Sequence, residues 1–440
     1  MNFDQLITLG VLAAVVAALI MDKVRADVVA LTGAAILLMS GAVRPSEVQG
    51  AFASPAIIAL ASLFVIAYAM ELTGLLDRAI GLAVSLCSRI GSVGLWILIA
   101  LSGGASAFLN NTPIVVLGAP VIKDVAEKLS LDPKRFLMPL SYVAVLGGCM
   151  TLIGTSTNLL VSDMARVSGQ PQFGLFEITP VGICVAAAGG LYLLLFSGRL
   201  IRSGQQERDN PDRRSVPAPD YHDPEVAGGQ IGTTDKFREH RNFQPAKALI
   251  AMLVFIAAIA IAALNIAPIA ASAFAGAVLL ILLRVLSPDQ AYSGLRPEIL
   301  MLIAGMVVLG IAMEQSGLAE EMTRGMLSLV EGVGPLGALI ILYGATLLLT
   351  ELLSNATVAV LITPIAVALG ESLGVSPRPF LVAVMMAGSA AFATPFGYQT
   401  NVIVYQMGGY SYMDFVRVGL PLNIITMVAG IIAITIFFPF

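Results

Sequence analysis

Residues 69–75 read AMELTGL, and residues 312–318 read AMEQSGL, at an offset of 243 positions. Further matches occur at this offset or at one position more: Pro45 with Pro288, Gly154 with Gly397, Thr157 with Thr400, Asn158 with Asn401, Pro120 with Pro364, Pro133 with Pro377, and Phe136 with Phe380. These polar and proline matches keep their order over more than 110 residues, so chance similarity between apolar segments does not account for them. The chain is therefore predicted to contain two copies of one unit.

The composition is that of a membrane protein. Hydrophobic residues make up 58% of the 440 residues, charged residues only 12%, and the mean hydropathy is +0.90. A water-soluble protein of this length could not cover its surface with so few charges. The net charge of −4 gives no reason to expect nucleic acid as a partner. No nucleophile–base set or metal-ligand motif predicts an enzyme, and Cys87, Cys149 and Cys184 are interpreted as reduced packing residues.

Apolar stretches that approach the ~20 residues needed to cross a bilayer recur along both copies. They lie near 6–21, 26–43, 54–72, 137–163 and 174–198, and then near 246–264, 268–286, 298–316, 380–407 and 415–437. Five crossings per copy turn the second copy upside down, which is the inverted repeat of many secondary transporters. The first repeat is thus predicted at 1–198 and the second at 246–440. The polar residues 199–245 are predicted to be a flexible linker.

The basic residues set the orientation. With the N-terminus outside and the spans alternating, 20 lysines and arginines fall on the cytoplasmic side, and only Arg44, Arg166, Arg324 and Arg378 fall outside. This bias obeys the positive-inside rule, and eleven against four remain when the linker is left out. We therefore expect a multi-pass protein of the inner membrane with both termini outside and the linker in the cytoplasm.

A further apolar segment lies between the third and fourth span of each copy. These segments are residues 95–129, interrupted by polar residues at 108–113, and residues 336–373, interrupted at 353–357. The piece from Ile114 to Ile122 is too short to cross a bilayer before Lys123 and Asp124 follow it. We therefore expect re-entrant helical hairpins whose tips stop near the middle of the membrane. The alternative is two full spans with a polar kink.

The hairpin tips carry groups that suit ions. Asn, Ser and Thr cap helices well, so the second helix of each hairpin is predicted to begin at the tip, with the positive end of its dipole directed inward. Such an end favours an anion, while the free carbonyl oxygens that end the first helix suit sodium. Glycine, proline and hydroxyl residues also interrupt the spans at 147–158 and 393–401, which predicts unwound backbone beside a cavity. Two tips and two breaks predict one central site.

At these residues the chain resembles the divalent anion/sodium symporter family. That family marks its tips with Ser-Asn-Thr, and the tips here read Asn110-Asn111-Thr112 and Ser354-Asn355-Ala356, with Thr357 next. The resemblance covers both halves. The chain is similar to a branch of the family that includes sulfate transporters and carries regulatory domains where this chain has only its short linker. The resemblance implies a homodimer that works by an elevator motion, in which the hairpin domain moves past a fixed scaffold in the lipid bilayer.

The resemblance also implies roles for individual residues. Substrate is expected at both tips and in both breaks, at Asn110, Asn111, Thr112, Thr157, Ser354, Asn355, Ala356, Thr357, Thr394 and Pro395. Sodium is expected at Ser106, Asn111, Thr350 and Asn355, and at backbone carbonyls near Met150 and Ala393. Sodium is the coupling ion, and no cofactor is expected.

These features predict sodium-coupled symport of a small divalent anion, either sulfate or a C4-dicarboxylate. Uptake into a negative-inside cell is opposed by about 2.3 kcal/mol per charge per 100 mV, so two sodium ions neutralise a dianion and a third makes uptake electrically favourable. The family's Gly-Thr-Pro-Pro-Asn in each break is replaced by Gly-Thr-Ser-Thr-Asn at 154–158 and Gly-Tyr-Gln-Thr-Asn at 397–401. The tips differ too, with Asn110 for Ser and Ala356 for Thr, so the choice of anion stays open.

Two other functions remain as alternatives. Glu351 is the one acid beside a tip, and acids at membrane depth are candidates for proton transfer. It would carry the proton in a sodium/proton antiporter of related architecture. Paired hairpins also occur in channels, but no ring of repeated filter carbonyls is present in the sequence.

Overall fold

The computed structural model describes residues 3–21, 23–75, 78–79, 81, 90–201, 243–319, 321 and 334–440. These residues form helices and connecting turns, and no strand occurs among them. The predicted all-α class is therefore confirmed. Most of the predicted linker, together with Cys87 and Arg324, lies outside the described residues.

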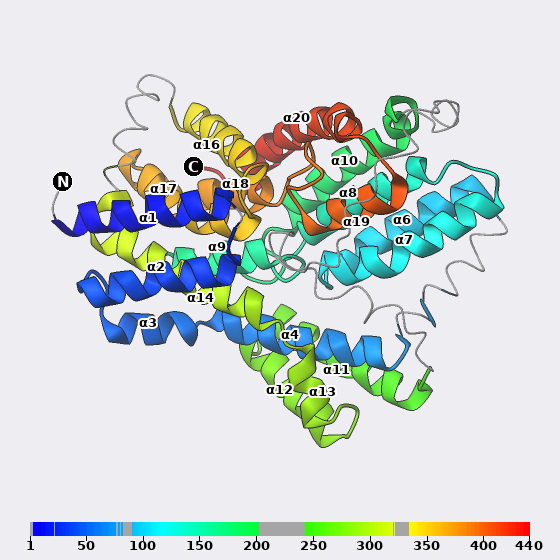
Figure 1. Cartoon of the computed structure of the whole chain (residues 1–440), viewed down its shortest axis with the longest axis horizontal. Coiled ribbons are helices and arrows are strands. Elements are labelled where there is room, and N and C mark those ends of the chain that lie inside the picture. The colour runs from blue at the N-terminus through cyan, green and yellow to red at the C-terminus, as the bar shows by residue number, and fades with distance from the viewer. Residues whose placement is uncertain are drawn as a thin grey trace.

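The helices form two groups that lie side by side (Figure 1). The first group contains α1 (Phe3–Met21), α2 (Ala26–Ser40), α3 (Pro45–Phe52), α4 (Pro55–Leu72), α11 (Pro245–Ala263), α12 (Ile269–Leu282), α13 (Pro288–Gly294) and α14 (Pro297–Gln315). The second group contains α6 (Ser92–Ser106), α7 (Asn111–Lys128), α8 (Lys134–Gly148), α9 (Ser156–Val167), α10 (Thr179–Leu200), α16 (Gly334–Thr350), α17 (Asn355–Ser372), α18 (Arg378–Gly388), α19 (Gln399–Gly408) and α20 (Tyr412–Phe437). Each group draws helices from both halves of the chain.

Contacts within each group are more extensive than contacts between the groups. In the first group α2 packs on α14, and α12 packs on α4 and α11. In the second group α10 packs on α20, α6 on α8, and α16 on α18. The groups meet mainly where α14 contacts α17 and where α4 and α14 contact α9. The boundary between them therefore rests on a small number of helices.

Several helices begin directly after a polar capping residue. Ser54, Asn110, Thr155 and Ser354 each accept a hydrogen bond from a backbone N–H in the first turn of the helix they precede. Such caps satisfy backbone donors that have no partner inside the helix. Helices α7 and α17 consequently begin at the residues that the sequence predicted as tips. The short helices α3 and α13, which start at Pro45 and Pro288, were not predicted.

Six helical segments within the described ranges are long and apolar enough to cross a membrane. They are Pro45–Leu72, Thr179–Leu200, Pro245–Ala263, Pro297–Gln315, Asn355–Ser372 and Tyr412–Phe437. The spans predicted near 137–163 and 380–407 each divide into two helices, with the breaks at the predicted glycine- and hydroxyl-rich positions. Helix α17, expected as one arm of a re-entrant hairpin, also has the length and composition of a full span.

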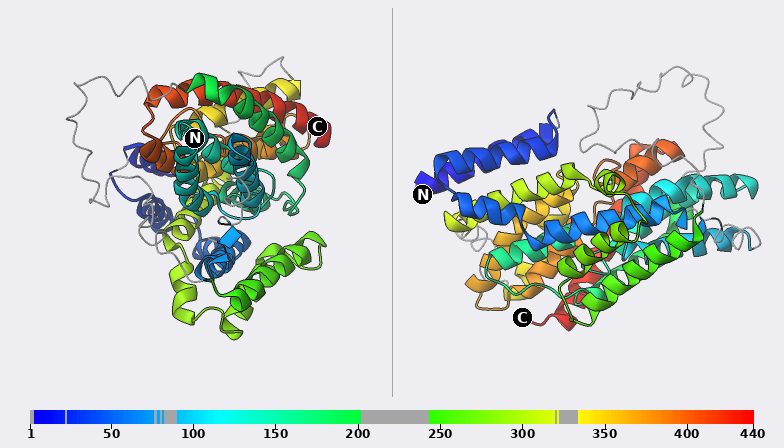
Figure 2. Two further views of the ribbon diagram at one scale, coloured as in Figure 1. Left: turned by 90° about the vertical axis from the view of Figure 1, so that its right-hand side faces the viewer. Right: turned by 90° about the horizontal axis from the view of Figure 1, so that it is seen from below.

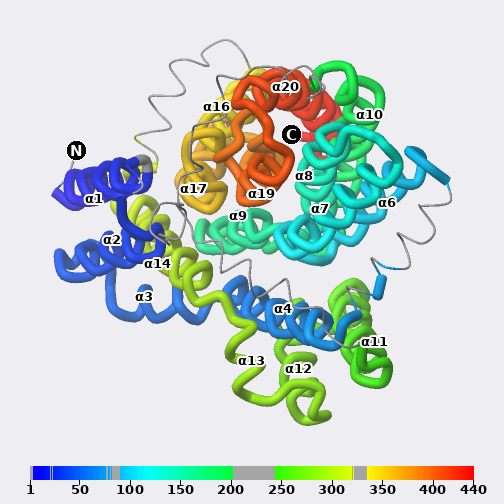
Figure 3. Tube along the Cα trace, turned by 45° about the vertical axis from the view of Figure 1, so that its right-hand side comes forward, coloured from blue at the N-terminus to red at the C-terminus, as the bar shows by residue number. Residues whose placement is uncertain are grey.

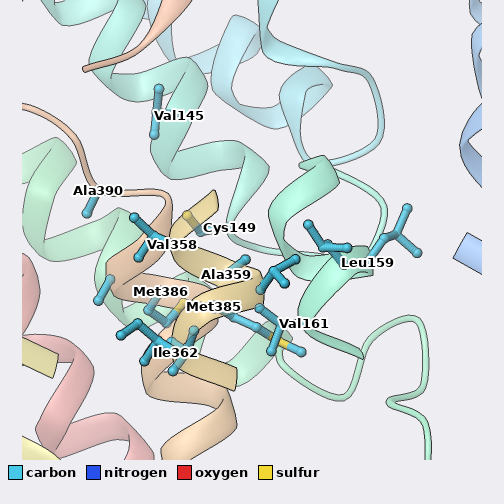
Figure 4. Close-up of a cluster of buried hydrophobic side chains, with 14 of the residues drawn as sticks. Val145, Cys149, Leu159, Val161, Val358, Ala359, Ile362, Met385, Met386 and Ala390 are labelled. Carbon is cyan, nitrogen blue, oxygen red and sulfur yellow. The ribbon is translucent and has the colours of Figure 1, made fainter. Parts of the chain in front are cut away.

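The core of the second group lies where α8, α9, α17 and α18 meet (Figure 4). Val145, Val161, Val358 and Met385 are among the buried side chains of this cluster. Small residues allow neighbouring backbones in this group to approach closely, as is common between membrane helices. A Cβ atom on Gly147 would overlap the carbonyl oxygen of Gly103, so α6 and α8 are in backbone contact.

The outer faces of several helices are apolar and exposed. Helices α11 and α12 project from the molecule on the side away from α20 (Figures 1 and 2). Leu249, Leu253, Phe274 and Leu282 are exposed on them. Apolar side chains exposed along the outer face of a helix are expected where that helix contacts lipid.

Candidate functional site

The first tip joins α6 to α7. The hydroxyl of Ser106, in the last turn of α6, donates a hydrogen bond to Oδ1 of Asn111 at 2.5 Å. Asn110 caps α7 by accepting a hydrogen bond from the N–H of Thr112. The residue packed against Asn111 is Gly148, where a Cβ atom would lie 2.7 Å from Asn111 Oδ1 and 3.2 Å from the carbonyl oxygen of Gly154. Oxygen atoms therefore converge beside the positive end of α7.

The second tip joins α16 to α17 and has the same construction. The hydroxyl of Thr350 lies 2.8 Å from Oδ1 of Asn355 and 2.9 Å from the carbonyl oxygen of Gly388. Ser354 caps α17, and its hydroxyl also lies 2.7 Å from that of Thr357. Asn355 is only 8% exposed. The Thr350 hydroxyl oxygen, Asn355 Oδ1 and the Gly388 carbonyl oxygen are thus closely spaced, and the Thr350 hydroxyl supplies the single hydrogen between them.

The two breaks are held by equivalent asparagines. Asn158 donates from Nδ2 to the carbonyl oxygen of Thr151 at 3.0 Å, and Asn401 donates from Nδ2 to that of Thr394 at 3.2 Å. These pairs are separated by 243 positions, while the Ser106–Asn111 and Thr350–Asn355 pairs are separated by 244. Positions that the sequence offset pairs with one another therefore make equivalent side-chain contacts in the structure.

Each tip lies against the break of the other half. In the first tip, Nδ2 of Asn111 donates to the hydroxyl of Tyr398 at 3.0 Å, and Thr112 lies 3.4 Å from Oε1 of Gln399. In the second, Thr157 packs beside Gly388, whose carbonyl oxygen contacts Thr350. Figure 3 shows α9 and α19, which follow the two breaks, between α17 and α7. The four motifs that the sequence predicted to converge are thus linked by contacts in one region of the second group.

The second tip holds several buried polar atoms that have no hydrogen-bond partner among the described residues. They include Nδ2 of Asn355, Oγ of Ser389 and Oε2 of Glu351. Leaving such groups unpaired is unfavourable, and native proteins pair most of them with protein, water or ions. At the first tip, by contrast, Nδ2 of Asn111 is already paired with Tyr398. The two tips therefore differ in what they can offer to a ligand.

The remaining predicted residues lie in or near this region with less distinctive contacts. The carbonyl oxygen of Met150 accepts a hydrogen bond from Thr179 at 2.7 Å. The hydroxyl of Thr394 accepts one from the N–H of Gly397 at 3.0 Å. Pro395 is buried, and Ala356 is half-buried in the first turn of α17.

Three side chains that the sequence did not assign to the symport site also belong to the region. Tyr398 and Gln399 contact the first tip directly. Oε1 of Glu351 accepts hydrogen bonds from the N–H of Ala393 and from Nδ2 of Asn423, both at 2.8 Å. The replacement of the family's threonine by Tyr398, and of its first proline by Gln399, was the available signal for the first two. Nothing in the sequence indicated the contact with Asn423.

Replacing Tyr398 by Phe is expected to lower the stability of the folded protein by about 1–3 kcal/mol, because the buried donor of Asn111 then loses its partner. Thermal unfolding of the purified protein in detergent measures this loss. Tyr405→Phe in α19, the helix that begins directly after Tyr398, is the matched control, since the Tyr405 ring packs on Phe415 outside the tip. Equal changes in the two variants would contradict a specific role for the Tyr398 hydroxyl.

Comparison with known proteins matches residues 16–374 and 352–439 to the citrate transporter family. The chain belongs to that family. This transporter is accordingly a multi-pass membrane protein rather than an enzyme. A solved structure with a similar fold is that of the YdaH transporter of Alcanivorax borkumensis, at a TM-score of 0.58 and 15% identity, covering 88% of this chain and 86% of that one.

Curated relatives include sodium-coupled anion transporters. Sodium/sulfate cotransporter 1 of Chlamydomonas reinhardtii is 36% identical over 160 residues, which are 36% of this chain and 18% of that protein. The sodium-dependent dicarboxylate transporter SdcS of Staphylococcus saprophyticus is 25% identical over 435 residues, covering 92% and 80%. A transporter of Synechocystis is 25% identical over an alignment of 586 positions, covering 96% and 95%, so it contains segments that this 440-residue chain lacks. The resemblance to divalent anion/sodium symporters is confirmed.

Proposed function

We propose that this transporter carries out sodium-coupled symport of a small divalent anion, sulfate or a C4-dicarboxylate. The proposal rests above all on Asn355. Its Oδ1 lies among closely spaced oxygens, while its buried Nδ2 has no partner among the residues described. One carboxamide thus offers an acceptor to a cation and a donor to an anion. Two relatives are named as a sodium/sulfate cotransporter and a sodium-dependent dicarboxylate transporter, and each name pairs a cation with an anion.

Sodium is proposed to bind at both tips. The first set of oxygens comprises Ser106 Oγ, Asn111 Oδ1 and the carbonyl of Gly154, and the second comprises Thr350 Oγ, Asn355 Oδ1 and the carbonyl of Gly388. Half-helix ends and unwound carbonyls are the usual sodium ligands of secondary transporters. Neighbouring carbonyls near Met150 and Ala393 remain candidates for the same ions. Two sodium sites of this kind neutralise one dianion.

The anion is proposed to bind closer to the second tip. The positive N-terminus of α17 lies at this tip and favours an anion. Asn355 and Ser389 also have buried donors here without a hydrogen-bond partner among the described residues. Thr357, Thr394 and Thr157 supply hydroxyls from three surrounding segments. At the first tip, the amide donor of Asn111 is already bonded to Tyr398, so Asn111 acts chiefly through its side-chain oxygen.

Sulfate is expected to be the better substrate of the two. Tyr398 and Gln399 stand where the related symporters have threonine and the first of two prolines, and both side chains extend to the first tip. Larger side chains leave less room beside the tip, which favours the smaller anion. Citrate, the anion in the family's name, is larger still and is expected to be a poor substrate.

The two helix groups suit an elevator motion. All site residues lie in the second group or its connecting segments, while the first group contacts it through a few helices. We propose that the second group, with both hairpins, moves past the first, and that the first provides a homodimer interface through its exposed apolar helices. We further propose two inverted repeats, with both termini outside the inner membrane and the linker in the cytoplasm.

Uptake of labelled sulfate, succinate and citrate into proteoliposomes tests the proposed function. An inward sodium gradient should drive accumulation of sulfate, and more weakly of succinate, whereas a choline gradient should not. Accumulation that is equal in sodium and choline would contradict sodium coupling. Sodium flux accompanied by lumen alkalinisation or acidification, with no anion present, would instead identify an antiporter.

Glu351 separates the symporter from the antiporter. Its Oε1 accepts one hydrogen bond from the N–H of Ala393 in the break and one from Nδ2 of Asn423 in α20, an acceptor role that glutamine also fills. We expect Glu351→Gln to keep sodium-driven uptake within about threefold, and Glu351→Ala to lower it about 10- to 100-fold, because two buried bonds of about 1 kcal/mol each are lost. Loss of all transport in Glu351→Gln would favour Glu351 as a proton carrier.

A further inference from the structure

A cavity of about 270 Å³ lies on the boundary between the two helix groups. Helix α4 and the loop between α11 and α12 line it from the first group. Helix α9 and residues 172–175 line it from the second group. None of the tip residues contributes to it, although Leu152 of the first break does. The cavity is therefore separate from the two tips and is bounded by both groups at once.

The cavity contains one charged side chain, Asp163, which is 2% exposed. Its Oδ1 accepts hydrogen bonds from Nε and Nη2 of Arg166, at 3.2 and 3.1 Å. Its Oδ2 has no hydrogen-bond partner among the residues that the structure describes. The hydroxyl of Ser54, which caps α4, interacts with this carboxylate from the other group, without a hydrogen bond of normal geometry to Oδ2. Because a carboxylate oxygen accepts more than one hydrogen bond, Oδ2 still offers a buried acceptor at the boundary.

The remaining walls define the size and polarity of a suitable molecule. Pro55, Leu152, Phe173 and Ile269 make most of the surface apolar, and exposed residues of the α11–α12 loop border it. Since Arg166 balances the charge of Asp163, an ionic ligand finds no net opposite charge here. A cavity of about 150 Å³ accommodates benzene, so this one has room for a substituted ring.

We propose that this cavity binds a small neutral aromatic alcohol, whose ring fills the apolar space and whose hydroxyl donates to Oδ2 of Asp163. Such a molecule contacts both helix groups at the same time. It stabilises their present arrangement by mass action, and so it arrests any movement of one group past the other. This consequence rests on the proposed elevator function, whereas the binding itself does not.

The test compares 4-ethylphenol with 4-ethylanisole, which has the same ring but no hydroxyl donor. Binding to the purified protein is measured by saturation-transfer NMR in detergent. We expect saturable binding of 4-ethylphenol that is at least about tenfold tighter than that of 4-ethylanisole. Equal binding of the two compounds, as for partitioning into the micelle, would overturn the proposal.

Two variants of the α11–α12 loop locate the site. Ala267→Trp fills the cavity from a half-buried lining position, while Leu264→Trp places the same ring at an exposed position outside the lining. Only Ala267→Trp should abolish 4-ethylphenol binding, and unchanged binding in that variant would overturn the site. In the unmodified protein, 4-ethylphenol should lower the maximal rate of sulfate uptake without changing the half-saturating sulfate concentration. Binding without inhibition would contradict the arrest, while absent binding with intact uptake would overturn the cavity proposal and leave the transport function standing.

Discussion

The Asn355→Ala variant is expected to lose sodium-driven anion uptake by about 100- to 10,000-fold. Asn355 is proposed to contact sodium through Oδ1 and the anion through Nδ2. Hydrogen bonds to charged groups contribute about 1.5–3 kcal/mol each, so two lost contacts amount to about 3–6 kcal/mol. Uptake of labelled sulfate into proteoliposomes under a sodium gradient measures the effect.

Two further variants make this result specific. Asn265→Gly is the matched control, because Asn265 lies in the α11–α12 loop at a φ of 54°, which glycine adopts readily. It should transport sulfate at the normal rate. Asn355→Asp keeps an oxygen for sodium but loses the donor, so it should retain sodium binding while losing sulfate. Near-normal uptake in Asn355→Ala would contradict the proposed site.

The Gly147→Ala variant is expected to disrupt the first tip from a position outside it. Alanine normally stabilises a helix interior by about 1 kcal/mol relative to glycine. Here its Cβ would overlap the carbonyl oxygen of Gly103, so α6 must move away from α8. Overpacking of this kind costs about 1–3 kcal/mol, and Ser106 at the end of α6 moves with the helix. Uptake should fall at least about tenfold, and thermal unfolding should shift downward.

Gly190→Ala is the corresponding control. Gly190 also lies inside a helix, α10, but apart from its chain neighbours and the backbone of its own helix no atom lies within 4 Å of the position that its Cβ would take. This variant should be as stable as the original protein or slightly more so, with unchanged uptake. Similar losses in both glycine variants would contradict the interpretation of the α6–α8 contact.

The helix starts at the two tips could be predicted from the sequence. Asn110 and Ser354 each begin a short polar cluster of capping residue types inside a long apolar segment, and caps act over only a few residues. The internal offset then identified equivalent positions in the two halves. Local chemistry and self-comparison were therefore sufficient for these features, and for the all-α membrane class.

The contact between Asn111 and Tyr398 could not be predicted in the same way. The two residues are 287 positions apart, and their meeting depends on how α7 packs against α19. The same holds for Glu351 and Asn423, which are 72 positions apart. The sequence thus predicted which segments carry ion-binding groups, but the difference between the two tips arises only from tertiary packing.

The division into two helix groups was also beyond the sequence alone. The resemblance to a symporter family implied a scaffold and a moving domain, but not which helices meet at their boundary. Helices α4, α9, α14 and α17 form that boundary, with Asp163 buried there. Hydropathy does not distinguish α4, α14 and α17 from the helices that face lipid, because all of them are apolar.

Equilibrium binding of labelled sulfate to the purified protein, titrated with sodium, tests most directly whether one site holds both ions. Linkage requires that each ion strengthen the binding of the other. Sulfate affinity should therefore rise steeply with sodium at constant ionic strength, and Asn355→Ala should remove this dependence. Sulfate affinity that is the same in sodium and in choline would contradict a shared site between the tips.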